Sequence, residues 1–401
     1  MTIALNILGI IVVLGILYLM SPNKKDINKK MIIKAFIIQL VLAFILVKFP
    51  LGQMALQKVS DFVTKALSYG ADGVSFVFGD LTKGNVFAVN VLANIIFVSA
   101  LVGALYYLGV IGFVVKMIGG VIGKILGTSK VESFVAVANM FLGQTESPIL
   151  VSKYLGAMNK SEIMLVLVSG MGSMSATVLM GYAGMGIPMK FLLIGGALVP
   201  LGSIIVSKIL LPETKEEIAL REAAATEEVS MDNKGDNPNL ISAVTEWAMN
   251  GLNMALGIGA TLIGIIALVA MFNGILGIIG TSLEQILSYL FAPLGFLMGL
   301  PKHDILTASQ LLGSKMVLNE FVAFGQLGEI IKSLDYRSAL MMSVSLTGFA
   351  NIASMGMCIS GIAVFCPEKR GQLSELAFRG MIGGFLVSVL SALVVGLIIA
   401  L

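Results

Sequence analysis

The sequence predicts an all-α polytopic membrane protein with an inverted repeat. Hydrophobic residues make up 57% of the 401 residues and charged residues only 12%, against about 25% in ordinary soluble domains. Eight stretches are apolar and long enough to cross a bilayer. Two further apolar segments are interrupted by polar residues with a Glu in the middle, and they recur in the same order in the two parts of the chain. These observations exclude a soluble enzyme, a disordered protein and a nucleic-acid binder.

The expected elements follow one another along the chain. Since a transmembrane helix needs roughly 20 apolar residues, the expected spans are residues 3–20, 31–49, 85–115, 164–189, 191–211, 247–283, 338–365 and 380–401. The first stretch lacks a basic segment before it and a small-residue cleavage site after it, so we expect a retained span rather than a signal peptide. Residues 51–69 place apolar side chains at helical spacing with charges between them, which is typical of an amphipathic helix on the membrane surface. Residues 115–127 and 281–292 resemble it.

Lysine and arginine in short loops predict the orientation. The loop at 21–30 contains four lysines and the loop at 366–372 is basic too, so we expect both on the cytoplasmic side. With eight full spans, both termini then lie on the outer face, periplasmic or extracellular. The acidic segment at 212–246 also falls inside, because Asp and Glu weigh little in this rule, and its composition indicates a flexible linker.

The element order predicts five parts. They are N-terminal scaffold spans with interfacial helices (1–127), a first re-entrant hairpin with two spans (128–211), the cytoplasmic acidic linker (212–246), a long scaffold span with an interfacial helix (247–298), and a second re-entrant hairpin with two spans (299–401). An odd number of crossings separates the two hairpin units, so they should face opposite ways. Inverted repeats with broken helices are typical of secondary transporters, whose sites lie near the bilayer midplane.

The strongest chemical signal is the run GQTESP at residues 143–148. Inserting a Glu at membrane depth costs a few kcal/mol of free energy, and the scales give about 2.5–3.5 kcal/mol for Asp, a comparable residue. Glu146 should therefore face a cavity or a partner. Gly143 and Pro148 interrupt the helix, which indicates the tip of a re-entrant hairpin. The alternative is an ordinary surface loop, but the apolar flanks are each too short to span a membrane alone.

Two further polar groups follow in the second half. Asn319 and Glu320 stand among apolar and aromatic residues, where the alternative is a helix end in water. Asn351 and Ser354 in the run GFANIAS at 348–354 lie three apart, on one helical face. The alternative for this pair is hydrogen bonding between helices, which is common in membrane bundles. The run GSMSATV at 172–178 is its counterpart in the first half.

These three motifs resemble those of the concentrative nucleoside transporter family. Residues 143–148 resemble its hairpin-tip motif GQTEAP, with Ser147 in place of Ala, residues 319–323 resemble NEFVA, and residues 348–351 resemble GFAN. Order and spacing agree over nearly the whole chain. The resemblance implies eight transmembrane helices, two opposed re-entrant hairpins, interfacial helices and a homotrimer. It also implies a nucleoside substrate driven inward by sodium or, in some members, by protons.

The resemblance implies a role for each motif residue. Those facing the nucleobase would be Gln144, Thr145 and Glu146. Those holding the ribose hydroxyls would be Glu320, Asn351 and Ser354. Apolar walls would come from Val178, Phe349 and Met254. Those coordinating sodium would be Asn139, Leu142, Ser173 and Met174. The chemistry agrees, because a carboxylate accepts hydrogen bonds from vicinal hydroxyls and freed carbonyls at helix breaks are sodium ligands.

The predicted function is therefore an ion-coupled symporter, with sodium as the expected ion, that imports uridine-like nucleosides across a bacterial inner membrane by alternating access. Its expected partners are the nucleoside, membrane lipid and two further copies in a homotrimer, with no nucleic acid. Three alternatives are a proton-coupled nucleoside symporter, a transporter of another polar solute, and a passive channel. An anionic solute would be repelled by Glu146 and Glu320.

An intramembrane enzyme is not expected. The single histidine, His303, excludes an H-E-x-x-H metalloprotease helix, and the chain contains no G-x-S-x-G motif. One histidine and two cysteines also cannot build the usual zinc sites.

Overall fold

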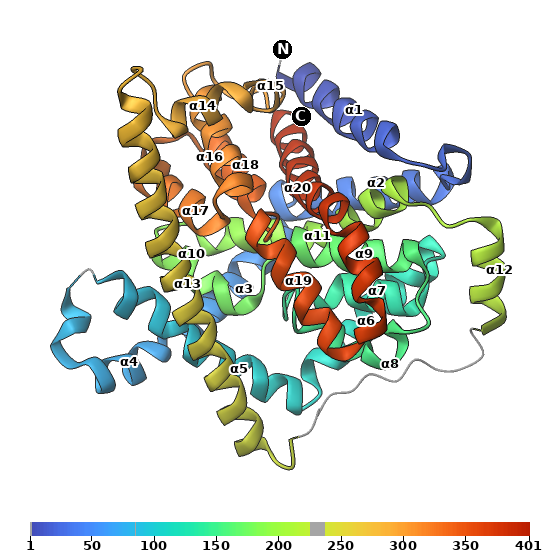
Figure 1. The fold of residues 1–401 in the computed structure, drawn as a ribbon, viewed down its shortest axis with the longest axis horizontal. Coiled ribbons are helices and arrows are strands. Elements are labelled where there is room, and N and C mark those ends of the chain that lie inside the picture. The colour runs from blue at the N-terminus through green and yellow to red at the C-terminus, as the bar shows by residue number, and fades with distance from the viewer. Residues whose placement is uncertain (1, 85, 225–236) are drawn as a thin grey trace.

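The structure, a computed structural model, describes residues 2–84, 86–224 and 237–401, and every regular element in these ranges is helical (Figure 1). The helices up to the linker are α1 (Thr2–Met20), α2 (Lys29–Val47), α3 (Pro50–Ser68), α4 (Gly70–Phe78), α5 (Ala93–Tyr107), α6 (Val110–Leu126), α7 (Lys130–Ala138), α8 (Ser152–Leu155), α9 (Lys160–Gly172), α10 (Ala176–Gly184), α11 (Met189–Leu210) and α12 (Lys215–Ala224). The later helices are α13 (Leu240–Gly277), α14 (Leu283–Leu290), α15 (Ala292–Leu297), α16 (Ile305–Val317), α17 (Glu320–Ile330), α18 (Tyr336–Leu346), α19 (Ile352–Phe365) and α20 (Arg370–Ala400). Short 3-10 and π turns are η1 (Lys24–Asp26), η2 (Gly79–Lys83), η3 (Ala88–Leu92), η4 (Ser147–Val151), η5 (Ile331–Ser333) and η6 (Pro367–Lys369).

Seven helical segments in the described ranges are long and apolar enough to cross a membrane. They are Thr2–Met20, Lys29–Val47, Ala88–Tyr107, Lys160–Gly184, Met189–Leu210, Leu240–Gly277 and Pro367–Ala400. The remaining predicted span, 338–365, is divided into α18 and the 14-residue apolar helix α19. The prediction of eight spans thus depends on counting this broken pair as one crossing.

Two units with the same order of elements form the centre of the molecule. In the first, a hairpin of α7, η4 and α8 precedes the broken pair α9–α10 and the long helix α11. In the second, the hairpin α16–α17 precedes the broken pair α18–α19 and the long helix α20. α9 packs against α20, and α11 packs against α18. The first span of each unit therefore packs on the last span of the other, as the predicted inverted repeat requires.

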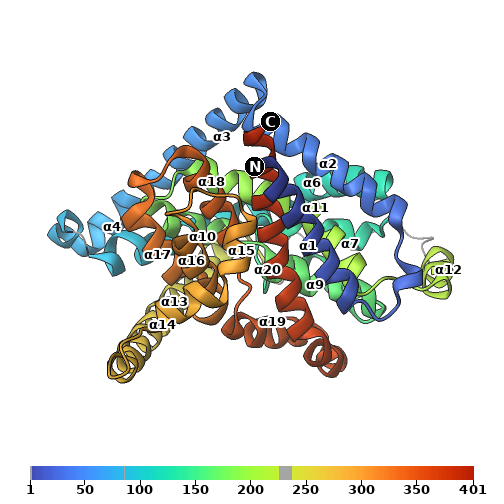
Figure 2. The ribbon, with the colours of Figure 1, turned by 90° about the horizontal axis from the view of Figure 1, so that it is seen from above.

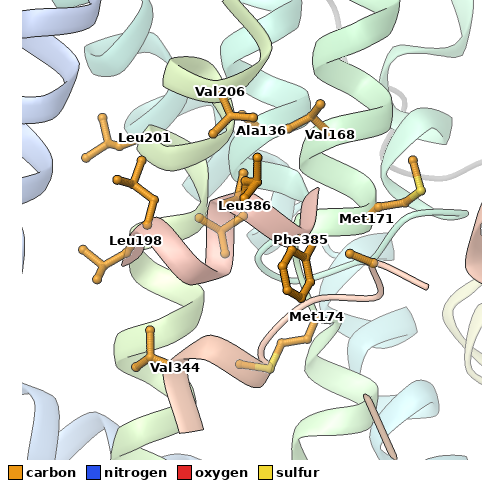
Figure 3. Packing of buried hydrophobic residues seen from close by; sticks show 14 of the residues in the cluster. Ala136, Val168, Met171, Met174, Leu198, Leu201, Val206, Val344, Phe385 and Leu386 are labelled. Carbon is orange, nitrogen blue, oxygen red and sulfur yellow. The ribbon is translucent and has the colours of Figure 1, made fainter. Parts of the chain in front are cut away.

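The two helix breaks cross at very close range. Gly348 has a φ of +96°, and a Cβ there would lie 2.5 Å from the carbonyl oxygen of Gly172. The backbone N–H of Phe349 donates to the carbonyl of Ser173 at 3.1 Å. A large apolar cluster surrounds this crossing, with buried side chains from α7, α9, α11, α18 and α20 (Figure 3). A side chain at position 348 would overlap the backbone of the first break unless one of the two segments moved.

The other helices form a frame around the two repeats. α13, 38 residues long, runs along α5 and projects at one corner of the molecule when it is seen from above (Figure 2). α1 and α2 pack against α20 and α11, and the two termini lie near each other at the same end (Figure 1). α3 has the length expected for the amphipathic helix at 51–69. The scaffold role expected of these helices stays a prediction.

A buried charge cluster lies where the predicted linker begins. Lys208, at the end of α11, forms ion pairs with Glu132 of α7 and with Glu213, and its ammonium also donates to Ser161 Oγ at 3.0 Å. Glu213 is buried, and α12 follows it as a helix, so the first part of the expected flexible linker is structured. Residues 225–236 of that linker lie outside the described residues.

An arginine within α20 connects the ends of two other helices at this side of the molecule. Arg379 of α20 donates to the carbonyls of Met20 and Leu210. The ends of α1 and α11, which lead into the loop at 21–30 and into the linker, therefore lie close together beside α20. The orientation relative to the membrane stays a prediction.

Candidate substrate-binding site

A cavity of about 430 Å³ lies between the two repeats and α13. Its volume falls within the range of about 300–1,000 Å³ found for small-molecule sites. All nine residues predicted to bind substrate line it: Gln144, Thr145, Glu146, Val178, Met254, Glu320, Phe349, Asn351 and Ser354. They come from the first hairpin, α10, α13, the second hairpin and the second break. Residues from distant parts of the sequence therefore form one cavity wall.

The tip of the first hairpin is packed inside the protein. Gly143, with a φ of +88°, makes the turn after α7. A Cβ on Gly170 of α9 would lie 3.1 Å from Gln144 Cβ, and a Cβ on Gly361 of α19 would lie 2.7 Å from Thr145 Cγ2. The tip thus fits between α9 and α19 because both helices present a glycine to it. The alternative of an ordinary surface loop is wrong for this segment.

One polar atom of this tip has no internal partner. Gln144 is only 7% exposed, and its Oε1 is buried without a hydrogen-bond partner among the residues that the structure describes. Leaving such an acceptor unpaired costs about 1–3 kcal/mol. Since Gln144 lines the cavity, a ligand with an N–H or O–H donor could satisfy this oxygen.

Glu320 begins α17 in the second hairpin. The preceding residue, Asn319, caps this helix, because its side chain accepts a hydrogen bond from the backbone N–H of Val322 at 2.8 Å. A carboxylate in the first turn of a helix is favoured by the helix dipole. Glu320 is only 5% exposed, so the alternative of a helix end in bulk water is wrong.

Asn351 connects the second helix break to this carboxylate. Its side-chain nitrogen donates to Glu320 Oε2 at 2.8 Å, while its Oδ1 accepts from the backbone N–H of Ser354 at 2.9 Å and caps α19. The three predicted ribose-binding residues are therefore linked in one buried chain. Asn351 does join two helices, as the structural alternative proposed, but it does so on the cavity wall.

The four residues predicted to coordinate sodium are all buried: Asn139, Leu142, Ser173 and Met174. The Asn139 side-chain nitrogen donates to Val135 O at 3.1 Å and to Ser169 Oγ at 2.9 Å, which fixes the orientation of the amide. Ser169 lies one helical turn before Ser173. These two bonds hold the side-chain oxygen of Asn139, Oδ1, in a fixed orientation near the end of α9.

Three neighbouring groups were not identified from the sequence. The hydroxyl of Ser147, where the resembling motif has Ala, donates to Asn139 Oδ1 at 2.8 Å. The Tyr182 hydroxyl lies 3.4 Å from Glu320 Oε1. Lys315, at the end of α16, is completely buried and is bonded to the second helix break. The position of Ser147 beside a conspicuous Glu was a usable signal, whereas nothing in the sequence indicates the partners of Lys315 or Tyr182.

α13 adds polar groups that the sequence did not single out. Asn253 and Thr261 line the cavity with Met254, on the side opposite the repeats. Met254 Sδ accepts from the Thr177 hydroxyl at 3.7 Å, which links α13 to the first repeat.

Three family profiles match consecutive parts of this chain. The profile described as "Na+ dependent nucleoside transporter C-terminus" matches residues 191–396, and the corresponding N-terminal profile matches residues 8–81. A profile described as "Nucleoside recognition" matches residues 88–189, which include the first hairpin.

Sequence similarity to known proteins extends over nearly the whole chain. "Nucleoside permease NupC" of Helicobacter pylori is 35% identical, covering 99% of this chain and 98% of the relative. "Solute carrier family 28 member 3" of Homo sapiens is 30% identical over 97% of this chain and 58% of its own length. The solved structure of CNTnw in an inward-facing, substrate-bound state has a TM-score of 0.92 at 34% identity, covering 99% of both chains. A CNTnw variant in an outward-facing state has a TM-score of 0.93 at 34% identity, covering 100% of this chain and 99% of that one.

Proposed function

Since the chain belongs to the concentrative nucleoside transporter family, we propose that it is a sodium-coupled symporter that imports uridine-like nucleosides. Nucleoside transport across a membrane, rather than enzymatic catalysis, is the activity of this family. The observation that carries the finer proposal is the gathering of all nine predicted substrate residues in one cavity between the repeats.

The nucleobase end of the cavity is the first hairpin tip. Gln144 offers a buried, unsatisfied oxygen together with its amide N–H groups, and Thr145 offers a hydroxyl. A uracil or adenine edge presents donors and acceptors side by side, which these groups match. Val178 and Phe349 supply apolar surface for the faces of the base. Glu146 lines the same part of the cavity and favours a neutral solute over an anion.

The ribose end is the second hairpin with the second break. Glu320 can accept hydrogen bonds from two vicinal hydroxyls, and Asn351 already holds its carboxylate in position at 2.8 Å. The Ser354 side chain lies one helical turn from Asn351 on the cavity wall. A site with its polar groups already oriented binds with a smaller entropic cost.

Sodium, as the co-transported ion, would be held between the first hairpin and the first break. The ligands would be the side-chain oxygens of Asn139 and Ser173 and the backbone carbonyls of Leu142 and Met174. A hard cation prefers such oxygen ligands, and unwound backbone next to a helix end is the usual site for coupling ions in transporters. The fixed amide of Asn139 supports this assignment. Protons are the alternative coupling ion.

The transport cycle would be alternating access. The moving unit would be residues 128–211 with 299–401, and the scaffold would be residues 1–127 with 247–298, joined by the cytoplasmic linker at 212–246. Relatives of the same fold in outward- and inward-facing states support such a cycle. We further propose a homotrimer in the bacterial inner membrane, with both termini on the outer side.

Uptake into liposomes tests the proposal. The purified protein is reconstituted, and radiolabelled uridine uptake is measured with high sodium outside, with equal sodium, and with a pH gradient instead. We expect accumulation above the external concentration only under the sodium gradient. Accumulation under the pH gradient alone would establish proton coupling.

Two further outcomes separate the remaining alternatives. Uptake that stops at equal concentrations under every gradient would show a passive channel. Competition by amino acids or carboxylates, but not by unlabelled nucleosides, would show a different solute. The variant Glu329→Gln is a suitable control, because this exposed carboxylate lies on the same helix as Glu320.

A further inference from the structure

Lys315 is the only lysine among the described residues with no exposed surface at all. Its ammonium donates to the carbonyl of Ser345 at 3.0 Å, to the carbonyl of Thr347 at 2.6 Å and to Ser388 Oγ at 2.6 Å. An ammonium has three donors, so all of them are used. It also lies 5.6 Å from the centre of the Phe385 ring. The ammonium group is therefore surrounded by three oxygens and an aromatic ring, an environment like that of a bound cation.

Two of the three oxygens that hold this ammonium, the carbonyls of Ser345 and Thr347, belong to a helix end. α18 ends at Leu346, and Thr347 is its C-cap residue. The last carbonyls of a helix have no intrahelical partner, and the helix dipole makes this end attractive for a positive charge. Burial of a charge is otherwise costly. Lys315 thus satisfies backbone groups that the break at 347–351 exposes.

The corresponding place in the first repeat is the proposed sodium site. There, Asn139 follows the first arm of the hairpin, and Ser173 is the C-cap residue of α9. In the second repeat, Lys315 lies in the last turn of the first hairpin arm, and Thr347 caps α18. Both places therefore lie between the end of a hairpin arm and the C-terminal end of a broken span.

We infer that Lys315 is a tethered cation that takes, in the second repeat, the place of the ion in the first, and that it positions the substrate-binding break at 347–351. The equivalence with an ion rests on the proposed function, whereas the positioning role does not. By holding the carbonyls of Ser345 and Thr347, the ammonium fixes the segment that carries Phe349 and Asn351 into the cavity. Lys315 is thus a positioning residue, which acts on substrate through this segment.

Replacement by alanine with a cation added back tests this role. In Lys315→Ala, uridine affinity is measured by calorimetry on the detergent-purified protein at saturating sodium. We expect about a tenfold loss, because hydrogen bonds from a charged group are removed. Methylammonium is small enough to replace the removed ammonium group, so adding it should raise the uridine affinity of this variant at least threefold. Choline is too large and should have no such effect. Lys332 is an exposed lysine of the same repeat, so the control variant Lys332→Ala should bind uridine like the wild type.

The same variant gives a readout that is independent of the nucleoside. Methylammonium should raise the melting temperature of Lys315→Ala and leave that of the wild type unchanged. If Lys315→Ala does not fold, Ser388→Ala replaces it, because it removes one of the three oxygens and should lower uridine affinity about threefold.

Three results would overturn the inference. They are wild-type affinity in Lys315→Ala, a loss that choline restores as well as methylammonium does, and, where only Ser388→Ala folds, unchanged affinity in that variant. A wild-type protein that binds no uridine would refute the proposed function instead, and the melting experiment would still decide the role of Lys315.

Discussion

The side-chain amide of Asn351 donates a 2.8 Å hydrogen bond to the carboxylate of Glu320. Glu320 belongs to the second hairpin and Asn351 to the second helix break, so the bond joins two separate segments at the cavity wall. The other carboxylate oxygen accepts from the Tyr182 hydroxyl over a longer distance, 3.4 Å. One oxygen of Glu320 is thus used for positioning, and the other has acceptor capacity for a ligand.

Glu320→Gln should weaken uridine binding more than Glu146→Gln does. Glutamine loses the charge and one acceptor at the proposed ribose site, and hydrogen bonds to charged groups contribute about 1.5–3 kcal/mol, so we expect a loss of at least tenfold. Calorimetric titration of both variants measures the difference, with Glu329→Gln as the control. Equal and mild losses in the two variants would contradict the ribose assignment.

Asn139→Ala and Ser173→Ala should weaken sodium dependence before they affect nucleoside selectivity. Each removes one proposed ion ligand, so the sodium concentration for half-maximal uptake should rise about tenfold, equivalent to ~1.4 kcal/mol. Uptake as a function of external sodium measures this shift. Ser360→Ala, which removes an exposed hydroxyl from α19, is the control. An unchanged sodium requirement would place the ion elsewhere or favour protons.

Gly348→Ala should destabilise the fold strongly. The new Cβ would meet the Gly172 carbonyl at 2.5 Å, and the φ of +96° is unfavourable for any L side chain. We expect a cost of about 2–4 kcal/mol from strain and overpacking together. Melting in detergent measures the effect, and Gly356→Ala is the control because a Cβ there meets nothing within 4 Å. Similar melting temperatures for the two variants would mean that the two breaks can separate.

Lys208→Met should also destabilise the protein, by about 3–5 kcal/mol. It would leave Glu132 and Glu213 buried without their shared cation, and removing one partner of a buried ion pair has this cost. The matched control is Lys160→Met, whose ion pair with Glu375 is more than half exposed and should contribute at most about 1 kcal/mol. The melting temperatures of the two variants give the comparison. Equally small decreases in melting temperature would show that Glu132 and Glu213 are hydrated and do not require the ammonium of Lys208.

The positions of the site residues could be predicted because polar groups are rare at membrane depth. Glu146, Glu320 and Asn351 are conspicuous in apolar surroundings, and the repeat makes their order meaningful. Their convergence on one cavity follows from packing that the motif order already indicated. The all-helical class followed from composition and apolar length alone.

The contacts of the buried lysines could not be predicted. Lys208 is bonded to Glu132 and Ser161, far earlier in the chain. Lys315 is bonded to backbone carbonyls that become available only where a helix ends. Residue type does not indicate which carbonyls a break exposes. Composition also placed Glu213 in a flexible linker, because its neighbours are charged and nothing in the sequence indicates the ion pair that buries it.

The crossing of Gly172 and Gly348 limits how the cavity can open. Because no Cβ-sized gap lies between the two breaks, drawing the proposed nucleobase end and the proposed ribose end apart would break this contact. We therefore expect access to change at the α13 wall, where Asn253, Met254 and Thr261 line the cavity. The bound solute would then move together with both repeats as one rigid unit, along the surface of the scaffold helices.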